Sequence, residues 1–131
     1  TIQKSVKRFL RETQILSDKD CNYAFGIVLC FWQSLTELLV KQWENPRKHM
    51  LNKGVGVYSL MSIAADIYKE EVNVKPPDWS ITFKQKLADF VFDIDWSNAG
   101  ALKGLGGEAG VREAVEYIRM QRAKRRIFRV V

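Results

Sequence analysis

Apolar residues recur every three or four positions along most of the chain, and this spacing constrains the fold more than any other feature. The strongest instance runs from about residue 21 to residue 44, where the helical period is continuous and the first half is apolar on every side. Pro46 ends this segment, because proline lacks a backbone donor and clashes with the preceding turn. We therefore expect a long apolar helix at the centre of the fold.

Four other segments share the helical spacing and complete an all-α prediction of about five helices. They cover about residues 2–13, about 57–71, a stretch in which Thr82 and Gln85 have the spacing of a capping box, and a last helix from about Val111. Residues 17–20 supply helix-capping side chains, 74–78 a stiff proline linker, and 98–110 a glycine-rich loop before the last helix. The alternating stretch 90–96 could form a strand, but the helical period explains more of it. The predicted core includes Phe9, Ile27, Phe31, Leu35, Leu60, Leu87, Phe90 and Ile118.

The composition fits one domain in a reducing compartment. With 131 residues, 47% of them hydrophobic, residues 1–131 can form a single continuous core. The chain begins with Thr1 rather than Met, so we expect it to be part of a longer protein. On one helix, Cys21 and Cys30 would face opposite sides and could not form a disulfide. Reduced cysteines, with neither a secretory leader nor a membrane-spanning run, favour a cytoplasmic protein without a membrane partner.

The excess positive charge lies at one end of the chain. The net charge is +6, yet residues 1–118 contain 15 basic and 15 acidic residues, so the whole excess belongs to residues 119–131. We treat this segment as a basic C-terminal extension of the domain. Its basic residues are Arg119, Arg122, Lys124, Arg125, Arg126 and Arg129.

The position of these arginines predicts that the last helix leaves the body of the domain. At 100° per residue, the core face that ends at Ile118 is continued by Arg122, Arg125, Arg126 and Arg129. Guanidinium groups cannot enter a dry core without partners. The helix should therefore run past the body near residue 119, or break there.

Two functions suit such a helix, and a solvated tail is the third interpretation. Arginines on one face can neutralise the phosphates of DNA or RNA. Alternatively, the apolar stripe on the other side, which includes Met120 and Phe128, docks on another protein, on a missing part of this one or on a second copy. The first helix offers a second basic face, for which a solvated surface is the simpler interpretation. That face is formed by Lys4, Lys7, Arg8 and Arg11.

No group of residues points to catalysis, a metal or a cofactor. The loop 104–110 fits a loose dinucleotide pattern, but it lacks a preceding βαβ unit and a Walker lysine, so a structural loop with positive φ angles is the better interpretation. Asp93 and Asp95 resemble the start of a calcium loop that lacks its glycine and its glutamate. With His49 as the only histidine, we expect neither a transition-metal site nor an enzyme. The expected structural loop residues are Trp96, Gly104, Gly106, Gly107 and Gly110.

Aromatic residues and glycines follow a distinctive order between Asn22 and Tyr117. The long helix contains Phe31, Trp32, Leu35 and Trp43, and it is followed by the segments 56–60, 95–97 and 104–111, and then by Ala114. This order resembles the C-terminal helical part of the DGQHR-motif proteins, bacterial relatives of the regulator of the DNA-phosphorothioation (Dnd) system. The Asp-Gly-Gln-His-Arg motif itself is absent, and it belongs to an N-terminal α/β portion that this chain would lack.

The resemblance implies a helical accessory domain of a DNA-associated protein from a defence system, a modification system or a mobile element. Activities of the N-terminal portion do not carry over to this chain. We therefore predict a non-catalytic domain whose basic last helix contacts nucleic-acid phosphates. The alternative is a protein-interaction or oligomerisation module with a structural role.

Overall fold

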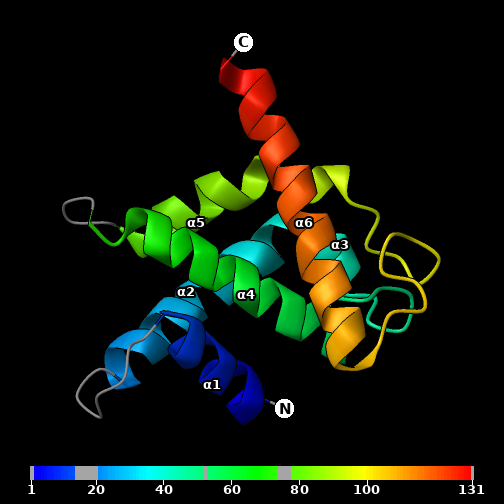
Figure 1. The fold of residues 1–131 in the computed structure, drawn as a ribbon, viewed down its shortest axis with the longest axis horizontal. Helices are drawn as coiled ribbons and strands as arrows, with labels where there is room; N and C mark the ends of the chain where they lie inside the picture. Colours follow the sequence, from blue (N-terminus) through cyan, green and yellow to red (C-terminus); the bar gives the residue numbers. More distant parts are fainter. Residues whose placement is uncertain (1, 14–20, 52, 74–77, 131) are drawn as a thin grey trace.

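Helices account for most of the chain (Figure 1). The computed structural model describes residues 2–13, 21–51, 53–73 and 78–130, with side chains for 4–13, 22–51, 53–73 and 78–124. Within these ranges there is no β-strand, which confirms the all-α prediction, and no helix has the length and apolar character needed to cross a bilayer. The elements are α1 (Ile2–Thr13), α2 (Cys21–Leu38), α3 (Val40–Trp43), α4 (Gly54–Glu71), α5 (Trp79–Ala88), the 3-10 turn η2 (Val91–Asp93) and α6 (Gly107–Val130).

Helix α4 lies at the centre of the fold. Helix α1 packs on one side of it and α6 on the other, while α2 packs mainly against α5 (Figure 1). Every residue of α4 from Ser59 to Ala65 is buried. Four of these seven are serine or alanine, whose small side chains let two neighbouring helices approach closely. The central helix therefore depends on small residues as well as apolar ones.

The prediction that the segment 21–44 lies at the centre was wrong. Helix α2 buries one face only, and its outer face leaves Tyr23 48%, Phe25 54% and Leu29 48% exposed. The segment is also divided, because Leu39 (φ −114°, ψ 48°) separates α2 from α3. An apolar sequence on all sides of a helix thus did not mean burial on all sides.

The eight residues predicted for the core are all buried. Their exposed fractions are 0% except for Ile27, at 2%. Phe31 meets the rings of Trp32 and Phe83 edge-on, with centroids 5.5 and 5.3 Å apart, and thereby joins α2 to α5. The helical spacing therefore identified the inward-facing residues correctly even where it misplaced a whole helix.

Helix α1 has the predicted bounds, whereas α5 begins earlier than expected. The Asp78 carboxylate accepts a hydrogen bond from the Ile81 N–H at 3.3 Å, so Asp78 is the N-cap and the proposed Thr82–Gln85 capping box was wrong. Helix α5 ends at Ala88, and residues 91–93 form η2 rather than a strand. The predicted capping segment 17–20 and residues 74–77 of the linker lie outside the described residues.

Helix α6 begins at Gly107, four residues before the predicted start, and continues unbroken to Val130. Its first half packs against α4, and its last turns extend beyond the rest of the molecule (Figure 1). Of the two expected behaviours, running past the body and breaking, the structure shows the first.

Candidate anion-binding groove

A groove lies between α1 and the start of α6, with α4 between them. It encloses about 540 Å³, and four of its lining residues are the basic residues of α1. The other walls are formed by Gly54, Val55 and Tyr58 of α4, and by Gly107, Glu108 and Val111 at the start of α6. A smaller hollow of about 270 Å³ shares Arg8 with this groove and is bordered by Ser62 of α4 and Arg112 of α6. The same pair of helices therefore borders both hollows.

The four basic residues of α1 differ in how firmly they are held. Arg8 is half-buried, and its Nε donates to Ser62 Oγ at 2.9 Å and lies 3.3 Å from Glu12 Oε1. Ser62 Oγ in turn donates to Glu12 Oε1 at 3.0 Å, so these three groups form a closed network. Lys4, Lys7 and Arg11 are exposed, and no other residue of the described ranges pairs with their side chains.

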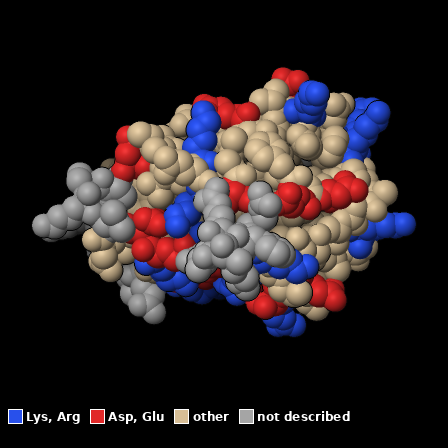
Figure 2. Space-filling model, turned by 90° about the horizontal axis from the view of Figure 1, so that it is seen from above, with Lys and Arg blue, Asp and Glu red and all other residues tan. Residues whose placement is uncertain are grey.

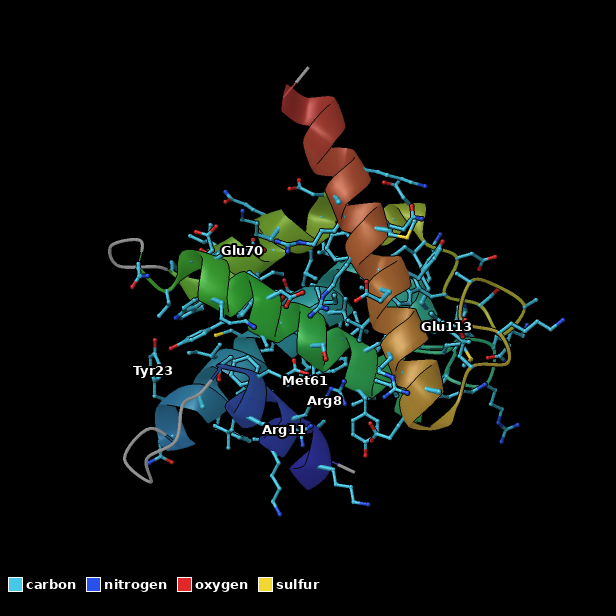
Figure 3. The ribbon with its side chains drawn as sticks, in the orientation of Figure 1. Arg8, Arg11, Tyr23, Met61, Glu70 and Glu113 are labelled. Atoms are coloured by element: carbon cyan, nitrogen blue, oxygen red, sulfur yellow. The ribbon has the colours of Figure 1, made fainter. Side chains whose placement is uncertain are left out.

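Among the described residues, the groove therefore presents three cations without partners on one wall. Figure 3 shows Arg8 and Arg11 on α1, beside α4. On the opposite wall, Gly107, Glu108 and Val111 of α6 line the groove, so the positive end of the helix dipole and the Glu108 carboxylate both lie at its border. Lysine and arginine donors on one wall and the positive end of a helix dipole at the other suit a phosphate or another oxyanion.

Arg119 and Arg122, predicted to face a ligand, are engaged with acidic residues of this chain. Arg119 donates through Nε and Nη2 to the two Asp66 oxygens at 2.8 and 3.0 Å, and through Nη1 to Glu116 at 3.2 Å. Arg122 donates through Nη1 and Nη2 to the two Glu70 oxygens at 2.7 and 2.8 Å. The hydrogen bonds to Asp66 also raise the pKa of Arg119 above its ordinary value.

The expected end of the body near residue 119 was therefore wrong by one turn. Arg122 is only 7% exposed and still packs with the body, because Glu70 supplies the partner that a buried guanidinium needs. Contact of Arg119 and Arg122 with phosphates stays a prediction, and it would have to compete with these pairs.

Beyond Arg122 the structure describes one further basic side chain, Lys124, which is exposed. The side chains of Arg125, Arg126 and Arg129 lie outside the described residues. On the face seen in Figure 2, acidic and basic side chains are interspersed rather than gathered into one basic area. On the described surface, the groove rather than this face therefore offers adjacent cations without acidic partners.

Four of the five predicted structural loop residues lie around the start of α6, and Trp96 lies before them in the chain. Trp96 is 1% exposed, and its indole N–H donates to the Val91 carbonyl at 2.9 Å. Gly104 and Gly107 have φ angles of 76° and 66°, which favour glycine. A side chain on Gly110 would collide with the Leu105 backbone, whereas Gly106 faces open space. Gly107 and Glu108, where this loop joins α6, line the groove, and the sequence did not predict this position.

The remaining chemical candidates are not assembled into a site. Hydrogen bonds from the hydroxyl and the backbone N–H of Ser97, and more weakly the charge of His49, hold the pKa of Asp95 below its ordinary value. Cys30 is a free, half-buried thiol, and the side chain of Cys21 lies outside the described residues. Within the described ranges, no three His, Cys, Asp or Glu side chains lie close enough together to hold a metal ion.

In comparisons with known proteins, no family model, no curated protein and no solved structure matches this chain. The resemblance to the DGQHR-motif proteins therefore stays a prediction. The geometry of the groove and the distribution of charge are the observations on which a function can be argued.

Proposed function

We propose that this chain is a non-catalytic helical accessory domain of a DNA-associated protein in the bacterial cytoplasm, and that it contacts nucleic-acid phosphates. The observation that supports this function best is the wall of the groove on α1, where Lys4, Lys7 and Arg11 are exposed without partners among the described residues. The basic end of α6, with Lys124 exposed, is the second contact surface.

The three unpaired cations lie within about two turns of one helix. Residues three and four positions apart on a helix are neighbours, so Lys4, Lys7 and Arg11 form one continuous row. A row of cations on a phosphate backbone releases condensed counterions, and this release supplies most of a sequence-independent affinity. The DGQHR-like order of aromatics and glycines supports DNA as the nucleic acid, and an RNA oligonucleotide is the comparison.

The test is a titration of fluorescently labelled duplex DNA, single-stranded DNA and RNA, followed by anisotropy at several salt concentrations. The variant Lys4→Ala/Lys7→Ala/Arg11→Ala should bind duplex DNA more weakly. The slope of log affinity against log salt should fall by about 0.9 for each phosphate that the variant no longer neutralises, or up to about 2.7 in total. A second variant, with alanine at Lys124, Arg125, Arg126 and Arg129, tests the end of α6.

The matched control removes the same charge elsewhere. Arg47, Lys48 and Lys103 are exposed outside the groove, so their triple alanine variant lowers the net charge of +6 by the same three units. Its salt slope should stay close to that of the unmodified protein. Equal affinities and slopes for the groove variant and this control would eliminate the groove as a phosphate site.

The alternative function, a protein-interaction module, is supported by a different observation. Phe25 and Leu29 of α2 are 54% and 48% exposed, and together with Val6 of α1 they line an apolar groove of about 360 Å³.

A further inference from the structure

The floor of the anion-binding groove between α1 and the start of α6 differs in chemistry from its rim. Val55 and Val111 line the groove and are 7% and 5% exposed, whereas the lining residues Lys4, Lys7 and Arg11 are exposed. Buried lining residues lie deeper than exposed ones, so apolar groups form the floor and cations form the rim on the α1 side. Phosphate contacts account for the rim alone and leave the floor without a role.

Tyr58 adds an aromatic ring to this floor. Its side chain is half-buried, packs against the core and lines the groove. Elsewhere in the fold aromatic rings are paired, as where Tyr68 stacks on Trp79 with ring centroids 5.2 Å apart. Among the described residues, no ring contact or hydrogen bond joins the Tyr58 side chain to another residue. Tyr58 can therefore offer its ring to a ligand beside the row of cations.

Glu108 makes the two sides of the groove electrically unlike. It is exposed on the α6 side, opposite the cations of α1. A carboxylate repels phosphate and accepts hydrogen bonds from N–H groups, which occur on the edges of nucleic-acid bases. A nucleotide combines a phosphate with a planar base that has apolar faces and N–H donors. It therefore matches the cations, the floor and the carboxylate together, whereas a phosphate matches the cations alone.

Only an unpaired nucleotide can use the floor of the groove. In a duplex each base is stacked between its neighbours, so phosphates reach the rim but the face of a base does not reach Tyr58. Single strands can present their bases individually, and proteins that bind them combine a positively charged groove with aromatic side chains on which the bases stack. The groove has both of these parts.

We propose that this groove binds single-stranded DNA, with one unpaired base stacked on the Tyr58 ring and the neighbouring phosphates on Lys4, Lys7 and Arg11. The inference rests on the proposed function, because it uses the same three cations. It adds a residue that contacts a base and a preference for an unpaired strand. Duplex DNA contacts the rim only.

The test compares two single strands that differ only in their bases. One is a fluorescein-labelled thymidine oligonucleotide of twelve nucleotides, and the other has the same phosphates but abasic sugars throughout. At a fixed salt concentration, anisotropy should show that the full chain binds the thymidine strand about tenfold more tightly, which is typical of one base stacked on an aromatic side chain. Because the phosphates are equal in number, this ratio reports contact with a base.

Three variants assign the contact to the Tyr58 ring. Tyr58→Leu removes the ring and keeps an apolar side chain against the core, so it should bind both strands equally. Tyr58→Phe keeps the ring and should retain the preference for the thymidine strand. Tyr23→Leu removes a tyrosine that is 48% exposed outside the groove, and it should also retain this preference. A blunt duplex should bind all three variants as tightly as it binds the unmodified protein, and circular dichroism should show all three folded.

Two results would overturn the inference while leaving the proposed function intact. In one, the unmodified protein binds the thymidine and abasic strands equally, a comparison that does not depend on the folding of any variant. In the other, Tyr58→Leu still prefers the thymidine strand. A third result, in which Lys4→Ala/Lys7→Ala/Arg11→Ala binds the duplex and both single strands as tightly as the unmodified protein, would overturn both proposals, because the phosphate contacts are common to them.

Discussion

Replacement of Glu70 by alanine should destabilise the protein more than replacement of its partner, Arg122, by methionine. The two groups share hydrogen bonds of 2.7 and 2.8 Å, and their side chains are 30% and 8% exposed respectively. Glu70→Ala leaves a guanidinium with little access to water. Arg122→Met leaves a carboxylate that solvent reaches, and it keeps most of the aliphatic packing against α4.

The expected loss of stability follows from the burial of this pair, which lies between that of a fully buried pair and that of an exposed pair. Removing one partner of a fully buried pair costs about 3–5 kcal/mol, and an exposed pair contributes about 0.2–1 kcal/mol. Since Glu70 is 30% exposed, we expect a loss of about 2 kcal/mol for Glu70→Ala and about 1 kcal/mol for Arg122→Met. For 131 residues, with an unfolding entropy of about 2.1 cal/mol/K per residue, about 2 kcal/mol lowers Tm by about 7 °C.

Urea unfolding followed by circular dichroism measures these differences, provided that the m-value is unchanged. The matched control is Glu37→Ala. It breaks a pair of 2.6 Å with Lys84 in which the side chains are 59% and 53% exposed, and it should cost less than about 1 kcal/mol. A loss for Glu70→Ala no greater than for Glu37→Ala, or a greater loss for Arg122→Met, would refute this account of the pair.

Three further predictions concern the segment before α6 and its loop. Gly107→Ala should destabilise the fold by about 1 kcal/mol because φ is positive there, whereas Gly106→Ala should be neutral or slightly stabilising; thermal unfolding compares them. Trp96→Phe removes the donor to the buried Val91 carbonyl and should cost about 2 kcal/mol in urea unfolding. Because the pKa of Asp95 is lowered from 3.8 in the folded state, its contribution to stability is present above that pH and is lost as the pH falls below it. The free energy of unfolding of Asp95→Asn should therefore be lower than that of the unmodified protein at pH 7. The two free energies should converge below about pH 3.8.

Local patterns predicted the helices and their buried faces well, because each is set by residues three and four positions apart. The bounds of α1, the buried residues of α5 and the positive φ of the loop glycines all depend on such short-range rules. The choice of central helix does not. It follows from the packing of α1 and α6 against α4, in which every residue from Ser59 to Ala65 is buried. Because the sequence of α2 is the more hydrophobic, it suggested α2 as the central helix, and the central position of α4 was not predicted.

The candidate site was predicted only in parts, because its parts are joined by contacts between distant residues. The basic face of α1 was visible as a helical spacing, but its position across α4 from Gly107 was not. The pairs of Arg119 with Asp66 and Arg122 with Glu70 span 53 and 52 positions. Asp66 and Glu70 are four residues apart, as partners on one helix face should be, and this spacing is the signal that could have suggested the pairing.

The two proposed basic surfaces lie at opposite ends of α6, and this separation sets the size of a ligand that touches both. Helix α6 begins beside the groove, and its last turns extend beyond the body (Figure 1). Its 24 residues, at a rise of about 1.5 Å each, span about 36 Å. Phosphates on one DNA strand are spaced about 3.4 Å along the duplex axis, so about ten base pairs are needed before both surfaces reach one duplex. A shorter duplex would engage one surface at a time. A salt slope that rises between duplexes below and above this length would therefore distinguish joint binding from two independent sites.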